Sequence, residues 1–291
     1  MSITKPKWFV REIRSTEDGK VVRRLLDSLE LNTVCREANC PNRNLCYNDG
    51  TATFLIMGKH CTRGCRFCNI EHGEPEPLDP TEPKRLAEAA AGMTLEHVVI
   101  TSVTRDDLAD GGAGHFAETV ESVRRALPSA SIEVLIPDLG GSAEALEVVL
   151  RSAPDIMNHN IETVEELYPA VRLGADYGRS LGVLERSSKS GFITKSGMML
   201  GLGEDYGQIE RAFEDLADAG INILTLGQYL APTKNHFPVK RYLPPEEFDS
   251  IAVMARKYGI EEVVAGPLVR SSFRAKEAFG KVLEIKRLTN V

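Results

Sequence analysis

Apolar and polar positions follow two rhythms along this chain. Beyond residue 51, short apolar runs of the kind that form buried strands alternate with longer segments whose apolar residues recur at helical spacing. The short runs predict strands at residues 53–57, 97–102, 131–136, 156–159, 198–202 and 221–226. The longer segments predict helices at residues 83–92, 113–127, 142–152, 164–173, 206–219 and 244–258. The first 50 residues show little clear periodicity, so we expect a polar extension there.

Repeated strand–helix units imply a parallel sheet, because each crossover helix returns the chain to the same edge. Six units fit a (β/α)6 barrel, complete or partial, and they also fit an open doubly wound sheet. In both α/β architectures ligands bind at the carboxyl ends of the strands. Polar residues gather at these ends, for example in Thr101-Ser-Val-Thr-Arg-Asp-Asp and Asn158-His-Asn-Ile-Glu. We therefore expect a binding pocket along this edge.

The composition is that of a globular protein, with 291 residues, 42% of them hydrophobic and 26% charged. A net charge of −7 argues against non-specific nucleic-acid binding. No apolar run approaches the roughly 20 residues needed to cross a bilayer, and the first residues lack the apolar stretch of a secretory signal. We expect a cytoplasmic protein that binds neither membrane nor nucleic acid, in a compartment where disulfides are rare.

All six cysteines fall between Cys35 and Cys68, and in a reducing compartment such crowding indicates metal ligation. Cys61, Cys65 and Cys68 have the spacing C-x3-C-x2-C, so three thiolates can surround one cubane cluster and leave its fourth iron open. Catalysis requires such an open metal position. One alternative is a zinc site, which prefers four ligands in paired C-x2-C units. The other is buried inert cysteines, which suit so polar a loop poorly.

The upstream trio has the spacing C-x4-C-x5-C at Cys35, Cys40 and Cys46. Three more thiolates predict a second cluster, again one protein ligand short. Half of a zinc site is the alternative, although no histidine follows closely. The scattered histidines are expected to be core or supporting residues rather than metal ligands. They are His60, His97, His115, His159 and His236.

The C-x3-C-x2-C spacing, with Phe67 just before the third cysteine, resembles the signature of the radical S-adenosylmethionine (SAM) superfamily. With the upstream trio, the chain is similar to the lipoyl synthase family over about residues 33–273. The similarity continues through Ile100-Thr-Ser-Val-Thr-Arg-Asp-Asp-Leu, Asp110-Gly-Gly-Ala-Gly-His-Phe, Asn158-His-Asn-Ile-Glu-Thr, Thr194-Lys-Ser-Gly-Met-Met-Leu-Gly-Leu-Gly-Glu, Leu224-Thr-Leu-Gly-Gln-Tyr and Gly266-Pro-Leu-Val-Arg-Ser-Ser-Phe. The family usually has tyrosine where Phe273 stands, a difference that leaves the preceding serine pair intact.

The resemblance implies an α/β fold, a partial (β/α)6 radical-SAM-type barrel. It implies three parts: an N-terminal extension with auxiliary-cluster cysteines (residues 1–50), the barrel (51–258) and a short C-terminal extension with the Arg-Ser-Ser motif (259–291). The implied cofactors are SAM and two 4Fe-4S clusters. Cys61, Cys65 and Cys68 would hold the cluster that cleaves SAM to a 5′-deoxyadenosyl radical. Cys35, Cys40, Cys46 and Ser272 would hold the auxiliary cluster.

The implied reaction inserts two sulfur atoms at C6 and C8 of a protein-bound octanoyl-lysine, with the auxiliary cluster as sulfur donor. Both carbons are unactivated, so hydrogen must be removed as an atom, and two SAM molecules are needed for each lipoyl group. Arg270 would lie near the substrate or protect Ser272. The implied SAM contacts are Phe67, Asn69, Thr101, Ser102, Asn160, Glu162, Arg179 and Lys195. Several of these also suit helix caps or solvated charges.

The resemblance also implies protein partners. These are octanoylated lipoyl carrier domains (2-oxoacid dehydrogenase E2 or glycine cleavage H protein), reduced flavodoxin or ferredoxin, and an iron–sulfur carrier for cluster repair. A monomer is expected because the substrate is itself a protein. Competing interpretations are a biotin synthase, a methylthiotransferase, an electron-transfer iron–sulfur module and a zinc-stabilised interaction domain. The first lacks the upstream cysteine trio, and the second needs an additional RNA-binding domain.

Overall fold

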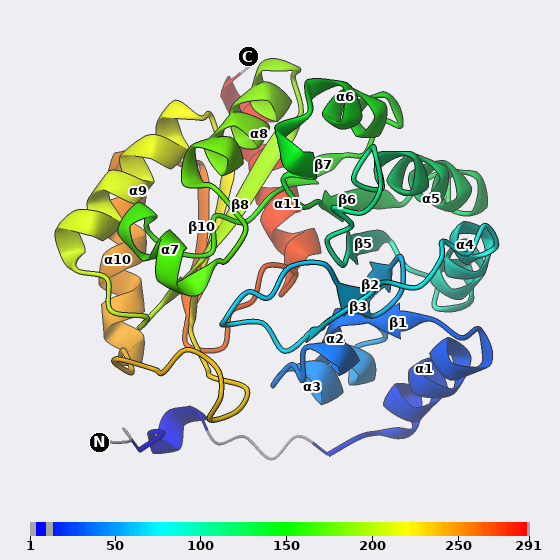
Figure 1. Ribbon diagram of the computed structural model, residues 1–291, viewed down its shortest axis with the longest axis horizontal. Coiled ribbons are helices and arrows are strands. Elements are labelled where there is room, and N and C mark those ends of the chain that lie inside the picture. The colour runs from blue at the N-terminus through cyan, green and yellow to red at the C-terminus, as the bar shows by residue number, and fades with distance from the viewer. Residues whose placement is uncertain (1–3, 10–13, 290–291) are drawn as a thin grey trace. The chain divides into compact units, whose positions relative to one another are not determined.

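The computed structural model describes residues 4–9 and 14–289 (Figure 1). Two compact units account for the described residues. The first unit comprises residues 14–64 and 69–155, and the second comprises residues 4–9, 65–68 and 156–289. The three-part division expected from the sequence stays a prediction. Among the described residues, no helix is both long and apolar enough to span a bilayer.

The first unit contains a four-stranded array whose neighbours follow the order β1 (Asn32–Thr33), β2 (Thr53–Ile56), β5 (His97–Ser102) and β6 (Ser131–Leu135). Strands β2, β5 and β6 are parallel, and β1 is antiparallel to β2. The short strands β3 (His60–Cys61) and β4 (Glu71–His72) pair separately. Because β2, β5 and β6 run the same way, their carboxyl ends meet at one edge.

The helices of the first unit are α1 (Glu17–Ser28), α2 (Val34–Glu37), α3 (Arg43–Asn48), α4 (Glu82–Gly92), α5 (Ala113–Ala126), η2 (Leu139–Gly141) and α6 (Ala143–Arg151). Helix α1 packs against α3, while α5 packs between α4 and α6 (Figure 1). The expectation of an aperiodic N-terminal extension is wrong for α1. Its N-cap Thr16 accepts a hydrogen bond from the N–H of Gly19, and Val22 and Leu26 form its buried stripe.

The second unit contains the parallel strands β7 (Ile156–Asn158), β8 (Ile193–Leu200), β9 (Ile223–Gln228) and β10 (Glu262–Gly266), adjacent in this order. Its helices are η1 (Lys7–Phe9), η3 (Glu165–Leu167), α7 (Tyr168–Val171), α8 (Tyr177–Lys189), α9 (Tyr206–Asp218), α10 (Pro245–Lys257) and α11 (Ala275–Thr289). Helix α8 packs on β8, α10 on β10, and α11 on β9 and β10. A core that includes Leu224, Phe213 and Phe248 fills the space between strands and helices.

All six predicted strands are present, but β8 begins five residues earlier than the apolar pattern indicated. Near its start the strand has fully buried polar residues, Thr194, Lys195 and Ser196. Because these side chains are polar, the apolar pattern did not include them in the predicted strand. The single helix predicted at residues 164–173 is wrong: the segment is divided between η3 and α7, each a single short turn. Helix α8 follows instead, although its two glycines and three serines are weak helix formers. Strand β10 and helix α11 were not predicted.

Candidate functional site

Cys61 ends strand β3 in the first unit. Its Sγ accepts hydrogen bonds from two backbone N–H groups, that of Thr104 at 3.3 Å and that of Arg63 at 3.5 Å. The Thr62 hydroxyl donates to the Thr104 carbonyl oxygen at 3.0 Å, which ties the cysteine loop to the segment after β5. These contacts fix the position of the Cys61 sulfur within the loop.

Two carboxylates clamp Arg63, which lies in the same loop. Its guanidinium donates to both oxygens of Asp106 at 2.7 Å and to both oxygens of Asp138 at 2.7 and 2.9 Å. The Arg63 side chain is 8% exposed and that of Asp138 is 0% exposed. Although burial opposes the charge, the hydrogen bonds to Asp106 and Asp138 raise the pKa of Arg63. Paired bonds of this kind fix orientation as well as distance, so protein contacts alone hold the loop that presents Cys61.

We expect Arg63→Gln to lower the free energy of unfolding by about 3 kcal/mol, because it leaves the Asp138 carboxylate buried without its cation. Urea unfolding of the metal-free protein measures the change. Arg125→Gln is the control, since the pair that Arg125 forms with Glu121 is exposed on α5 and should contribute less than about 1 kcal/mol. Equal stability losses in the two variants would show that the clamp has no special role.

Cys65 and Cys68 belong to the second unit, where they form a tight turn. The N–H of Cys68 donates to the Cys65 carbonyl oxygen at 3.1 Å. The Cys68 carbonyl oxygen lies 3.0 Å from His236 Nε2. Between them, Phe67 packs against a small apolar cluster that includes Tyr229 and Phe237. These contacts hold the turn from both sides and leave its cysteines half-buried.

The upstream cysteines lie on and between two short helices of the first unit. Cys35 is on α2, Cys46 is on α3, and Cys40 is in the connection. Burial raises the pKa of the Cys35 thiol to about 11. Burial, followed by the neighbouring Cys35 and Cys40 thiols, raises the pKa of Cys46 to about 12. The three thiols therefore lie near enough to influence one another, and metal binding here must displace their protons.

The described residues include no group of three or more His, Cys, Asp or Glu side chains that could hold a metal ion. A single zinc ion lies about 2.3 Å from each thiolate, which demands thiolates almost in contact. A four-iron cluster places its own iron and sulfide atoms between the thiolates, so it suits a wider trio. His115 lies 2.7 Å from Glu82 in the core, and His60 lies 2.8 Å from Glu76. These contacts match the supporting role expected for the histidines.

A chain of amides holds the C-terminal Arg-Ser-Ser motif in the second unit. Asn158 Nδ2 donates to the Ser271 hydroxyl at 2.9 Å, and that hydroxyl donates to Asn160 Oδ1 at 3.0 Å. Gly227 on β9 makes room for the same segment, since a Cβ there would lie 2.2 Å from the Val269 carbonyl oxygen. The sequence places Ser271 and Asn158 113 residues apart, and the fold brings them into contact.

Glu162 continues this chain into a cluster of half-buried charged residues. Asn160 Nδ2 donates to Glu162 Oε1 at 3.0 Å. Burial raises the pKa of Glu162, while Arg172 and Asn160 act to lower it. Burial also disfavours the charge of Arg172, but Tyr168, Glu162 and Cys65 raise its pKa. Arg172 is therefore the main cation that acts on Glu162, ahead of Arg270, and the sequence did not assign this role to it.

The other residues expected to bind SAM are distributed between the two units. In the first unit, the Thr101 hydroxyl donates to the Leu135 carbonyl oxygen at 2.8 Å, and Asn69 Nδ2 donates to the Glu37 carbonyl oxygen at 2.7 Å. Ser102 Oγ is buried and has no hydrogen-bond partner among the described residues. In the second unit, Lys195 is fully buried on β8, and Arg179 lies half-buried in the first turn of α8.

Arg63 and Arg172 are the two site residues that sequence reasoning missed. Arg63 stands between Cys61 and Cys65, and its position inside the cysteine motif was the available signal. Arg172 follows the apolar run Tyr168-Pro-Ala-Val within a segment predicted as an ordinary helix. The place of Arg172 directly after this apolar run was the only signal of its partial burial.

Comparison with known proteins agrees with the interpretation of the Cys61–Cys65–Cys68 spacing as a radical SAM signature. Residues 55–216 match the family described as the radical SAM superfamily. A lipoyl synthase of Nitratidesulfovibrio vulgaris is 49% identical over 286 residues, covering 98% of this chain and 96% of the relative. A lipoyl synthase of Leptospira interrogans is 51% identical over 257 residues, covering 88% of this chain and 85% of the relative.

The hydrogenase maturase HydG has a similar fold, with a TM-score of 0.58 over 96% of this chain and 72% of that protein, at 12% identity. A likeness at this identity concerns the fold alone, and it agrees with the α/β arrangement of parallel strands and covering helices. The relatives near 50% identity extend the similarity over almost the whole chain, including both cysteine trios. This protein belongs to the lipoyl synthase family of radical SAM enzymes.

Proposed function

We propose that this protein inserts two sulfur atoms, at C6 and C8, into an octanoyl chain carried on a lysine of another protein. The observation that carries the proposal is the presence of two cysteine trios in a chain that is 49% identical over 286 residues to a lipoyl synthase. One trio suits radical generation and the other suits sulfur supply. The target carbons are unactivated, so no acid or base of this chain would activate them.

Cys61, Cys65 and Cys68 would hold the radical-generating 4Fe-4S cluster. When bound and reduced, it would supply the electron that cleaves SAM to methionine and a 5′-deoxyadenosyl radical. The two N–H groups directed at Cys61 Sγ fit a thiolate ligand. The buried Ser102 hydroxyl, which has no partner in the described chain, suits the methionyl amine of SAM.

Cys35, Cys40, Cys46 and Ser272 would hold the auxiliary 4Fe-4S cluster that donates sulfur. The neighbouring Ser271 hydroxyl is already engaged by Asn158 and Asn160, which favours Ser272 as the ligand of the pair. A hydroxyl oxygen is a harder ligand than thiolate and a poorer match for iron–sulfur. It therefore suits a cluster that must come apart.

Glu162 and Asn160 would bind the ribose hydroxyls of SAM, and the half-buried Arg172 would position Glu162 by balancing its charge. Arg270, whose guanidinium donates to the Val269 carbonyl oxygen at 2.6 Å, would lie beside the substrate. The remaining proposed SAM contacts are Phe67, Asn69, Thr101, Arg179 and Lys195.

The acceptor would be an octanoylated carrier domain, such as that of a 2-oxoacid dehydrogenase E2 subunit or the glycine cleavage H protein. Reduced flavodoxin or ferredoxin would deliver electrons, and an iron–sulfur carrier would rebuild the auxiliary cluster. All six cysteines are free thiols, which supports the proposal that the enzyme acts in the reducing cytoplasm. The proposed division into an extension (1–50), barrel (51–258) and C-terminal extension (259–291) assigns each cysteine trio its own part.

Anaerobic incubation of the reconstituted, dithionite-reduced protein with SAM and an octanoyl-lysine peptide tests the proposal, with products followed by mass spectrometry. We expect a peptide that gains two sulfur atoms, together with 5′-deoxyadenosine and loss of cluster sulfide. Deoxyadenosine without sulfur on the peptide would place the substrate elsewhere. No deoxyadenosine from protein shown to carry both clusters would refute the enzymatic role.

A further inference from the structure

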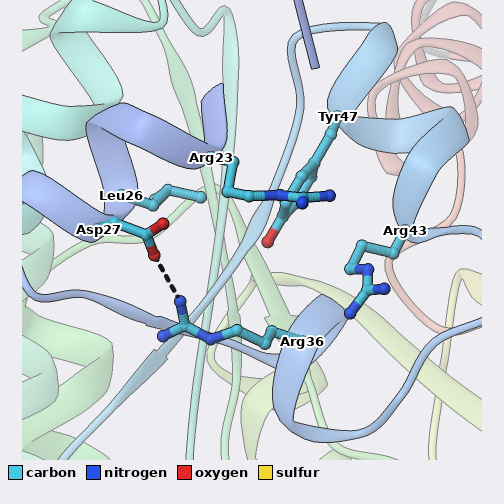
Figure 2. Close-up of a pocket in the computed structure, with 6 residues that line it drawn as sticks. All are labelled: Arg23, Leu26, Asp27, Arg36, Arg43 and Tyr47. Carbon is cyan, nitrogen blue, oxygen red and sulfur yellow. Dashed lines mark hydrogen bonds and ion pairs between the residues drawn. The ribbon is translucent and has the colours of Figure 1, made fainter. Parts of the chain in front are cut away.

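The helices that carry the upstream cysteines also form a small pocket of about 160 Å³ in the first unit. Figure 2 shows arginines entering it from three helices: Arg23 from α1, Arg36 from α2 and Arg43 from α3. Buried Leu26 and Tyr47 supply its apolar and aromatic lining, and the Tyr47 hydroxyl is fixed at 2.8 Å from the Thr33 hydroxyl. The pocket is therefore lined by arginine side chains on one part of its surface and by the apolar and aromatic side chains of Leu26 and Tyr47 on another.

Two of the three guanidinium groups lack partners. Arg36 donates to Asp27 and Glu37, each at 2.8 Å, and to the Leu31 carbonyl oxygen at 3.1 Å. The side chains of Arg23 and Arg43 make no hydrogen bond or ion pair with any residue that the structure describes, and Arg43 Nε is buried without an acceptor. A buried donor without an acceptor is costly, so an oxyanion entering the pocket would gain several charge-assisted bonds.

The lining favours a carboxylate over a phosphate. Asp27 also lines the pocket, and its negative charge repels a dianion more strongly than a monoanion. The apolar surface of Leu26 and Tyr47 suits the methylene stem of a glutamate or aspartate side chain. The whole chain carries a net charge of −7, so this pocket is a local reversal of sign that could orient an acidic partner.

We infer that the Arg23–Arg36–Arg43 pocket receives a carboxylate side chain of the carrier domain that brings the octanoyl-lysine. This inference rests on the proposed function and identifies a docking contact for its protein substrate. Arg36 follows Cys35 directly, and Arg43 lies between Cys40 and Cys46. A carrier anchored here would be held by the same short helices that present the proposed sulfur-donating ligands.

The test compares two octanoyl-lysine substrates in single-turnover reactions of the reconstituted holoenzyme. One is an octanoylated carrier domain with acidic residues around its lysine, and the other is a short, neutral octanoyl-lysine peptide. We expect Arg23→Glu to raise the half-saturating concentration of the carrier domain by roughly tenfold or more, the loss expected for a charge-assisted contact. The peptide should be used as before, because it has no carboxylate to dock.

Arg23→Glu is the decisive variant because Arg23 lies on α1, a helix that carries no cysteine. The double variant Arg23→Glu/Arg43→Glu should have a larger effect. The matched control Arg24→Glu/Arg125→Glu makes the same charge change at positions outside the pocket. Raising the salt concentration should weaken use of the carrier by the wild type and the control more than by the pocket variants.

The outcomes separate this inference from the proposed function. If the wild type modifies neither substrate, the proposed function fails. If it modifies both and Arg23→Glu leaves the half-saturating concentration of the carrier unchanged, the docking inference fails alone. The docking inference also fails if Arg23→Glu raises the half-saturating concentration equally for the carrier and for the neutral peptide. It fails as well if millimolar inorganic phosphate inhibits use of the carrier while the carrier's acidic residues have no effect on its half-saturating concentration.

Discussion

Replacement of Cys65 by alanine is expected to abolish the formation of 5′-deoxyadenosine while leaving the auxiliary cluster in place. Cys65 is one of three proposed cluster ligands within eight residues, so its loss would leave the proposed radical-generating cluster with two protein ligands. Residues that only support metal ligands typically contribute 10–100-fold to affinity or activity, and loss of a ligand should exceed about 100-fold. Anaerobic assays with dithionite and SAM measure the rate directly.

Iron and sulfide content provide the internal control for Cys65→Ala. The variant should retain about half of the iron of the wild type, since one of the two proposed four-iron clusters would remain. The backbone contacts around Cys65 do not need its thiol, because the Cys68 N–H donates to the Cys65 carbonyl oxygen. A variant with both clusters lost would indicate a general folding defect, and one that still cleaves SAM at the wild-type rate would contradict the ligand assignment.

Apolar periodicity predicted those elements whose burial follows from the residues alone. Strand β5 was predicted with its observed bounds because Val98, Val99 and Ile100 form an unbroken apolar run. Strand β8 was truncated in the prediction because Lys195, a charged residue, occupies a fully buried position. Periodicity treats a lysine as solvent-exposed, so it misplaces a strand wherever polar side chains line the interior.

Local propensity also failed where tertiary contacts decide the structure. Helix α8 contains Gly178, Gly182 and several serines, yet Val183 and Leu184 bury it against the strands. Its N-cap Asp176 accepts a hydrogen bond from the N–H of Arg179, which helps to fix its start. Most helical stability in proteins comes from packing of this kind, and packing cannot be deduced from a weak helix-forming sequence.

The candidate site also has features that the sequence predicts and features that depend on tertiary contacts. Cysteine spacing is local information, so the order of residues along the chain is enough to recognise both trios. The clamp of Arg63 by Asp106 and Asp138 joins residues 43 and 75 positions apart, and the Ser271–Asn158 contact spans 113. Such pairs depend on which strand ends lie together, which the order of strand–helix units suggests only coarsely.

The second large effect is expected for Cys40→Ala. This variant should still form 5′-deoxyadenosine from SAM but should transfer no sulfur to an octanoyl-lysine peptide. Cys40 lies between α2 and α3, and the remaining proposed ligands Cys35, Cys46 and Ser272 would hold the auxiliary cluster too weakly for it to survive purification. Mass spectrometry of the peptide and chromatography of the nucleoside measure the two steps in one reaction.

Cys65→Ala and Cys40→Ala are controls for each other, because each removes one thiol from a different trio. If radical generation and sulfur donation are separate tasks, the first variant loses both products and the second loses only the sulfur-bearing peptide. SAM cleavage in Cys40→Ala should be less coupled to substrate, since hydrogen abstraction from the peptide would no longer lead to a carbon–sulfur bond. Similar rates of SAM cleavage in both variants would disprove the division of labour between the trios, whatever their iron content.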